Sequence, residues 1–264
     1  MNSGCSSSHS PVSSSPRGVK KRKKKLTAVS VPVVETVSLT PSNDDYSFAV
    51  LSQRKELTSA WLTLLNKSFE DEPLDLEVVH SQHSDLSRPH CHVSLMTNKQ
   101  GEVICGCSFD CFPESATVLI GYMATHPNYK RQGLASKVLN EGLRVICSTM
   151  PRNGLPLLVF AEVSTDESGI SARPFWNAKG FKRIDFPYYL PPAYRKNTDL
   201  EEEYMLTAFD PDDIIQGNIP TQRVINFLQA YYDWCNTRED QGIVTMLDRL
   251  GLNSGCLKLV DIPV

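Results

Sequence analysis

The sequence lacks several features that would quickly assign it to a class of protein. No apolar run approaches the ~18 residues needed to cross a bilayer, so no membrane span is predicted. The eight cysteines form no CxxC pair and no zinc-finger spacing, which favours free thiols packed as small hydrophobes in a reducing compartment. Neither cysteine nor carboxylate stands at ligand spacing beside the clustered histidines, so no metal site is predicted at His80, His83, His90 and His92.

Acidic side chains are absent from the first 25 positions, which hold seven Lys or Arg residues. The chain has 27 basic and 30 acidic side chains, so the remaining residues hold 20 basic side chains against all 30 acids, a net charge of −10. Because contacts to phosphates need clustered cations, this acidic body disfavours binding to nucleic acid.

A disordered tail is expected over residues 1–42, because this Ser-, Pro- and Lys-rich tract shows no hydrophobic periodicity. Its basic run KKRKKK at residues 20–25 has three interpretations: a nuclear-localisation signal, a tether to an anionic surface, or a solvated tail. With no secretory core, the protein is predicted to be cytoplasmic, and nuclear if the basic run acts as a signal.

The hydrophobic pattern beyond the tail predicts an α+β fold, with a mixed sheet covered by helices. Apolar side chains at i, i+4, i+7 and i+8 predict a helix over residues 56–69. Two β-like runs at residues 92–96 and 103–109 flank a turn at residues 98–101 and predict a hairpin. Further strands are expected at residues 117–125, 157–163, 181–186 and 204–209, and further helices from residue 133 and over residues 168–178.

An apolar helix is expected beyond residue 211, where Val224, Phe227, Leu228 and Tyr231 form one stripe. A helix of this kind must bury its apolar face. We therefore expect residues 211–264 to form a helical extension packed on the main domain, with packing on a partner subunit as the alternative. The oligomeric state stays open.

The loop after Thr125 carries the strongest chemical signal. Pro127 prevents continued strand pairing, and the loop opens directly into a helix at Gly133. Unpaired N–H groups and partial positive charge at a helix start suit a phosphate, and a glycine there permits close approach to the backbone. Lys130 and Arg131 add cations. From these properties alone, an ordinary loop with solvated basic residues is an equal alternative.

The segment THPNYKRQGLA at residues 125–135 resembles the acetyl-CoA motif of the GNAT superfamily, V-x-P-x-x-R-x-x-G-x-G/A. Thr125 takes the usual place of valine, and Lys130 stands where Arg or Gln is usual and retains the charge. The remaining motif positions are matched by Pro127, Gly133 and Ala135.

A second segment, ARPFWNAKGF at residues 172–181, resembles the helix-to-strand motif A-x-x-F-Y-x-x-x-G-F of the same family. Trp176 replaces the common tyrosine. The two motifs stand in the order of the family, with a predicted strand between them. The resemblance covers residues 46–210.

The resemblance implies a GNAT acyltransferase domain over residues 46–210. It also implies a mixed, largely antiparallel central sheet flanked by helices, here with an extra C-terminal helix, and acetyl-CoA as co-substrate. The sheet would splay at residues 117–125, where backbone groups of Met123 and Thr125 would pair with the cofactor amide. The pyrophosphate would be bound at Lys130, Arg131, Gln132, Gly133, Leu134, Ala135 and Ser136.

Both familiar catalytic positions of the family are altered. Leu119 stands where many members place a glutamate, and Trp176 stands where a tyrosine protonates the leaving thiolate, so base and acid must come from elsewhere. Glu162 is the candidate base, with a structural carboxylate as the alternative. Tyr188 is the candidate acid, with wall packing as the alternative.

These features predict an acetyl-CoA-dependent N-acetyltransferase in which the amine attacks the thioester directly within a ternary complex. The acceptor is either a small-molecule amine or an amino group of a protein. The vacant acid and base positions favour the alternative, a catalytically weak acyl-CoA-binding module with a regulatory or interaction role.

Overall fold

The computed structural model describes residues 45–69, 91–195, 204–215, 217–252 and 255–263. Three features considered in the sequence lie outside these ranges: the tail, its basic run, and the histidines at positions 80, 83 and 90. Within the described ranges, no helix is long and apolar enough to cross a membrane.

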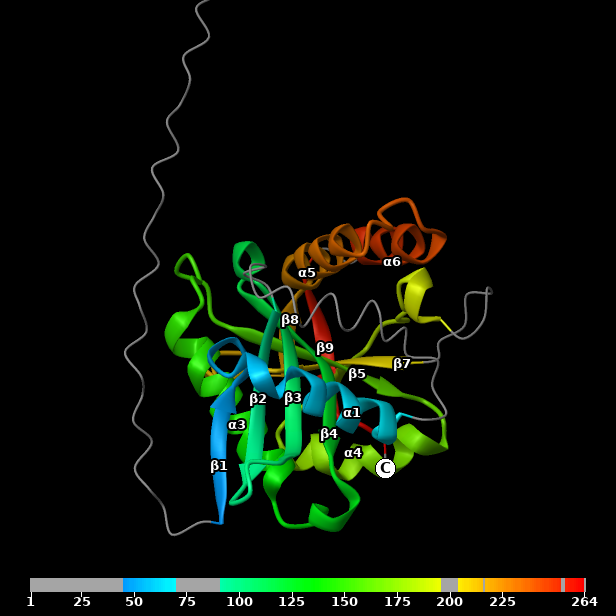
Figure 1. The fold of residues 1–264 in the computed structure, drawn as a ribbon. Helices are drawn as coiled ribbons and strands as arrows, with labels where there is room; N and C mark the ends of the chain where they lie inside the picture. The colour runs from blue at the N-terminus through cyan, green and yellow to red at the C-terminus, as the bar shows by residue number, and fades with distance from the viewer. Residues whose placement is uncertain (1–44, 70–90, 196–203, 216, 253–254, 264) are drawn as a thin grey trace, which may run out of the picture. The chain divides into compact units, whose positions relative to one another are not determined.

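One nine-stranded sheet organises the described residues, in the order β1-β2-β3-β4-β5-β7-β6-β9-β8 (Figure 1). Neighbouring strands pair antiparallel except for β4 and β5, which are parallel. The strands are β1 (Tyr46–Val50), β2 (Cys91–Asn98), β3 (Val103–Phe112), β4 (Thr117–Thr125), β5 (Leu158–Ser164), β6 (Lys182–Ile184), β7 (Tyr204–Phe209), β8 (Asn218–Pro220) and β9 (Cys256–Val260).

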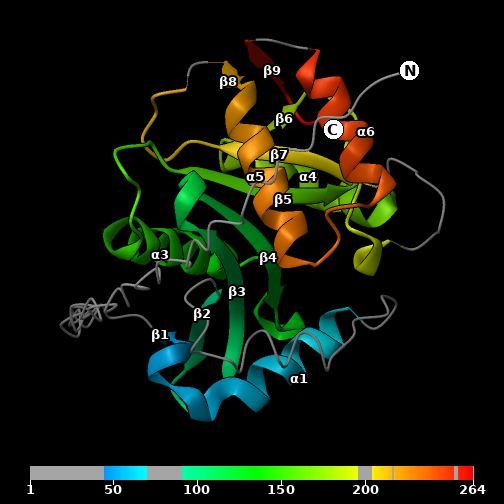
Figure 2. The same cartoon turned by 90° about the horizontal axis from the view of Figure 1, so that it is seen from above.

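Helices pack on both faces of the sheet (Figure 2). One face is covered by α3 and α4, and the other by α1 towards β2 and β3 and by α5 and α6 towards β5 and β7. The helices are α1 (Thr58–Ser68), α3 (Leu134–Thr149), α4 (Glu167–Ala178), α5 (Thr221–Trp234) and α6 (Gln241–Gly251). The helix α3 buries one face along its length, formed by Leu134, Val138, Leu139, Gly142, Leu143 and Ile146.

This architecture confirms the predicted fold class, a mixed and mostly antiparallel sheet flanked by helices. The hairpin, the central strand and the three helices of the main domain lie where the hydrophobic pattern predicts them, within a few residues. The strand predicted over residues 181–186 is shorter. It ends at Ile184, although the backbone N–H of the next residue, Asp185, still donates to the Lys258 carbonyl of β9 at 3.0 Å.

Residues 211–263 contribute more than the expected helix. They add a second helix, α6, and the strand β9, which pairs with β6 inside the sheet. Beyond β9, the Asn177 side chain of α4 donates to the Ile262 carbonyl at 2.9 Å and accepts from the Ile262 N–H at 3.3 Å. Ile262 is 1% exposed and completes the core between the sheet and α4.

A buried arginine fixes the start of α5. One terminal nitrogen of Arg223 lies within hydrogen-bond distance of three carbonyl oxygens, at 3.2 Å from Ser115, 3.2 Å from Ala116 and 2.8 Å from Pro156. These carbonyls belong to the turn before β4 and to the loop before β5. Arg223 therefore joins α5 to the two strands at the centre of the sheet.

We expect Arg223→Met to lower the free energy of unfolding by about 3 kcal/mol, because it leaves buried carbonyl groups without donors. Urea denaturation measures this change. Arg144→Met on α3 is the matched control, because Arg144 pairs with Glu141 at the surface and its loss should cost less than about 0.5 kcal/mol. Equal losses in the two variants would contradict the anchoring role of Arg223.

Candidate active site

β4 separates from β5 partway along its length. The two strands pair through Ile120↔Ala161 and no further, although β4 continues to Thr125 and β5 to Ser164. β4 remains paired with β3 as far as Thr125. Within the described residues, no strand pairs with the separated edge of β4, so its backbone N–H and C=O groups are available to a ligand. The separation agrees with the splayed sheet that the resemblance implies.

A β-bulge marks the point of separation. The register between β3 and β4 shifts, so that two residues of β4, Gly121 and Tyr122, face the single residue Ser108. The Tyr122 N–H donates to Ser108 Oγ at 2.8 Å. Because a bulge bends its strand and increases the local twist, it directs β4 away from β5.

The loop between β4 and α3 presents unpaired N–H groups. Arg131 and Gly133 have left-handed backbone conformations, with φ of 61° and 77°, and α3 begins at Leu134 without a side-chain cap. The first N–H to bond within the helix is that of Lys137, which donates to Gly133 at 3.0 Å. The first turn therefore offers free donors beside the exposed Lys130, an arrangement that suits an anion.

Contacts from other elements hold this loop in place. The Tyr46 hydroxyl of β1 donates to Gln132 Oε1 at 2.5 Å, and Gln132 Nε2 donates to the Asn128 carbonyl at 3.2 Å. The Tyr129 ring packs edge-on against Tyr46 and His126. The predicted cofactor residue Gln132 therefore uses its side chain within the protein, which leaves its backbone N–H for a ligand.

Glu162 and Tyr188, the two candidate catalytic residues, are hydrogen-bonded to each other. The Tyr188 hydroxyl donates to Glu162 Oε1, and Tyr231 of α5 is a second hydroxyl donor to the same carboxylate. Burial raises the pKa of Glu162 to about 7, and the two hydroxyl donors partly offset this rise. A carboxyl group that titrates near neutral pH is suited to general base catalysis.

The pKa of the Tyr188 hydroxyl is raised well above its ordinary value, chiefly by burial and then by the charge of Glu162. Tyr188 therefore keeps its proton at neutral pH and acts as a donor to Glu162. Only 1% of the residue is exposed, so it also packs in the core beneath α5, as the alternative interpretation expects.

Asp110 of β3 is a further acidic residue at this place. It pairs with Leu119 of β4, and its pKa is raised to about 7 by burial and by the charge of Glu162. Sequence reasoning missed it. The available signal was an acidic residue inside the otherwise apolar strand VICGCSFDCF.

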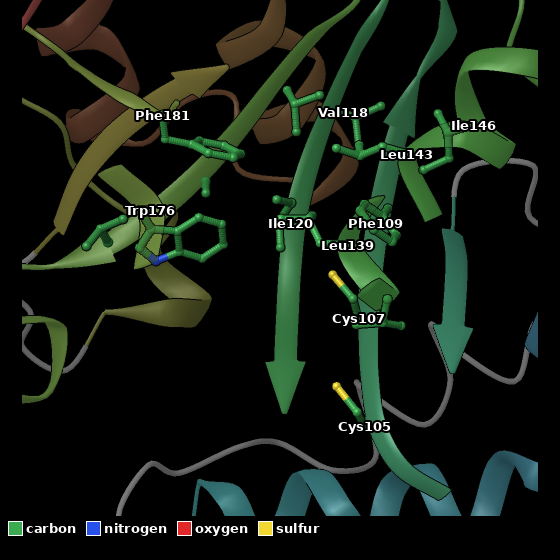
Figure 3. Close-up of a cluster of buried hydrophobic side chains, with 14 of the residues drawn as sticks. Cys105, Cys107, Phe109, Val118, Ile120, Leu139, Leu143, Ile146, Trp176 and Phe181 are labelled. Carbon is green, nitrogen blue, oxygen red and sulfur yellow. The ribbon is translucent and has the colours of Figure 1, made fainter. Parts of the chain in front are cut away.

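Trp176 and Leu119 are both buried in the core. Because neither side chain titrates, Leu119 cannot act as the base and Trp176 cannot act as the acid at the positions that the family motifs suggest. Figure 3 shows Trp176 and Phe181 beside Ile120 of β4, with Cys105 further along the neighbouring strand. The Cys105 Sγ lies 3.2 Å from the hydroxyl of Thr125, on the separated half of β4.

The structure thus brings the predicted site residues into two groups beside one strand. The predicted pyrophosphate-binding residues lie in the loop and the first turn of α3, and Met123 and Thr125 lie on the separated half of β4. Glu162 lies on β5, one residue beyond the last pair with β4.

Residues 55–181 match a family model described as the acetyltransferase (GNAT) family. A protein assigned to that family from Bacteroides thetaiotaomicron aligns with a TM-score of 0.51 and 16% identity, over 73% of this chain and 98% of its own, and shows the same fold. Another, from Desulfovibrio desulfuricans, aligns with a TM-score of 0.47 and 17% identity, over 62% of this chain and 98% of its own. No curated protein matches the sequence.

We expect the stability of the protein to fall as pH rises from 5 to 8, because the raised pKa of Glu162 means that the folded state binds more protons than the unfolded chain in this range. Glu162→Gln removes that contribution and still accepts the Tyr188 hydrogen bond. Between pH 5 and 8, the free energy of unfolding of the variant should therefore fall by on the order of 2 kcal/mol less than that of the wild type. Urea denaturation at both pH values measures the difference.

The groups that face Glu162 are Tyr188, Asp110, Tyr231 and Tyr232 of α5, and Cys235 directly after α5. Asp110 titrates in the same range and keeps part of the pH dependence in the variant. Glu141→Gln on the outer side of α3 is the control. Its stability should fall between pH 5 and 8 as much as that of the wild type. Parallel pH profiles for the wild type and Glu162→Gln would show that Glu162 titrates normally.

Proposed function

Because the domain at residues 55–181 belongs to the acetyltransferase (GNAT) family, we propose that this chain is an acetyl-CoA-dependent N-acetyltransferase. The amine attacks the thioester directly in a ternary complex. The observation that carries the proposal is the separated edge of β4, which leads from the Glu162–Tyr188 pair to the first turn of α3.

The residues present fit the cofactor. The pyrophosphate binds the backbone N–H groups of residues 131–136, with the cations of Lys130 and Arg131 beside them. Backbone groups of Met123 and Thr125 bind the pantetheine amide along the separated edge of β4. Acetyl-CoA supplies the acetyl group as a thioester.

Glu162 is the proposed general base and Tyr188 the proposed acid. Glu162 accepts a proton from the acceptor amine, because its pKa of about 7 lies close to neutral pH. Tyr188 orients that carboxylate and is its protonated neighbour. Burial raises the pKa of Cys105 to about 11 and that of Cys107 well above its ordinary value, so both remain thiols. This supports direct attack rather than an acyl-enzyme.

In the proposed organisation, the transferase domain spans residues 46–210. Residues 211–264 form an extension that places Tyr231 beside Glu162. The acceptor is a small-molecule amine or a protein amino group, and the site of action is the cytoplasm.

A second candidate function is a catalytically weak acyl-CoA-binding module. The burial of Leu119 and Trp176 at the usual base and acid positions favours it. Such a module binds acetyl-CoA but transfers the acetyl group to amines with little turnover. Significant turnover with any amine separates the two functions.

We expect acetyl-CoA to bind the full chain with a dissociation constant on the order of micromolar, and Gly133→Trp to weaken that binding at least tenfold. The bulky ring blocks the approach of the pyrophosphate to the backbone. A Cβ atom added at this position meets no atom within 4 Å, so the main expected cost to folding is the strain of the positive φ. Calorimetric titration measures both constants.

Gly154→Trp is the matched control. Gly154 has a φ of 78° and equally open surroundings, but it lies beyond the opposite end of α3. This variant suffers the same backbone strain and should bind acetyl-CoA as the wild type does. Loss of binding in both variants, or no binding by the wild type, would overturn the cofactor site.

A further inference from the structure

Gly121 is the one residue of β4 that is classed as exposed. The four residues before it on the strand are buried, and it lies at the bulge where β4 leaves β5. Solvent therefore reaches the backbone of a central strand at this point. An exposed position within a buried sheet gives a small molecule access to the groups around it.

Two carboxylates flank Gly121 from opposite sides. A Cβ atom added to Gly121 would lie 3.3 Å from Asp110 Oδ2 and 3.1 Å from Ser108 Oγ, so the Asp110 carboxylate extends over the glycine from β3. On the other side, Glu162 follows Ala161, the last residue of β5 to pair with β4. The absence of a side chain at Gly121 leaves the space between the carboxylates open.

The two carboxylates differ in their partners. Glu162 receives hydrogen bonds from Tyr188 and Tyr231. Asp110 accepts no side-chain hydrogen bond from any residue in the described ranges. Removing a carboxylate from water without a partner is costly, and a cation that binds beside it offsets that cost.

We propose that Asp110 and Glu162 together bind the ammonium group of the acyl acceptor above Gly121, and that the acceptor is a primary amine. The inference rests on the proposed function and identifies its substrate class. An ammonium has three N–H donors, enough for two carboxylates and the Ser108 hydroxyl.

The charge of the pair suits a single ammonium group. Each carboxyl has a pKa of about 7, and the pKa of Asp110 is raised by burial and by the charge of Glu162, so near neutral pH the pair holds about one proton and one negative charge. One positive charge on the acceptor neutralises it. Asp110 thereby fixes the position of the nitrogen, and Glu162 is free to remove a proton.

The transfer step balances with these groups. One ammonium proton passes to the Glu162 carboxylate, and the free amine attacks the thioester carbonyl to form the C–N bond. The C–S bond then breaks, Tyr188 protonates the thiolate and takes up the second proton of the nitrogen in its place, and Glu162 releases its proton to water. The products are an amide, the free thiol of CoA and one proton.

The test is carbon-13 NMR of the side-chain carboxyl groups in the full chain with CoA added, using n-butylammonium as the probe. Asp110→Asn and Glu162→Gln assign the two signals by their disappearance. In the wild type, both signals should titrate near pH 7, and n-butylammonium should lower both midpoints. Tetramethylammonium has the same charge but no N–H donor. The shift of the midpoints that it causes should be at least fivefold smaller.

Three variants separate binding from a structural effect. Glu162→Gln should lower the midpoint of Asp110, because the charge of Glu162 contributes to the raised pKa of Asp110. Asp110→Asn should abolish most of the response of Glu162 to n-butylammonium. Gly121→Ala keeps both carboxylates but fills the space between them. It should leave the midpoints in place and weaken the response to n-butylammonium at least fivefold. Asp248→Asn, on the exposed side of α6, is the control and should behave as the wild type.

The inference is overturned if the two carboxyl groups titrate at ordinary carboxyl pH values, if n-butylammonium moves neither signal, or if both cations act equally. Calorimetry of acetyl-CoA on the same samples is independent of these signals. Bound acetyl-CoA with unresponsive carboxyl groups would refute this acceptor site and leave the proposed function intact. Responsive carboxyl groups without acetyl-CoA binding would refute the proposed function instead.

Discussion

The central strand β4 lies between β3 and β5 but cannot stay paired with both along its whole length. It stays with β3 along its whole length but pairs with β5 over only four residues, and the bulge at Gly121 and Tyr122 is where the two pairings become incompatible. The unpaired edge of β4, the position of Glu162 and the direction from which the chain enters α3 all depend on this separation. Arg223 stabilises the arrangement by joining α5 to the paired ends of both strands.

Local signals in the sequence were sufficient for the parts of the fold that local physics controls. The α3 helix follows from its apolar stripe, and the anion-binding loop follows from Pro127 and from a glycine that adopts a positive φ. The strands of the main domain are long enough to show a pattern. Strands of three to five residues, such as β1, β8 and β9, carry too little periodicity to be recognised.

The acceptor side of the site depends on contacts between distant segments, which the sequence does not specify. Asp110 is visible as an acid within an apolar strand, but the bulge register is needed to place it over Gly121. Glu162 and Tyr188 each lie beyond or near the end of a predicted strand, and neither segment alone specifies the hydrogen bond between them. Tyr46, which holds the anion-binding loop, lies in an unpredicted strand and had no signal of its own.

The reciprocal hydrogen bonds between Asn177 and Ile262 have a consequence for how the molecule folds. The helix α4 carries the second family motif. The core between α4 and the sheet is completed by Ile262, which is synthesised much later, after β9. Contacts between segments so far apart in the chain slow folding, because the intervening loop must be closed first. The segment that matches the family model is therefore part of a larger cooperative unit, and its packing on the ribosome is incomplete until residues 256–262 emerge.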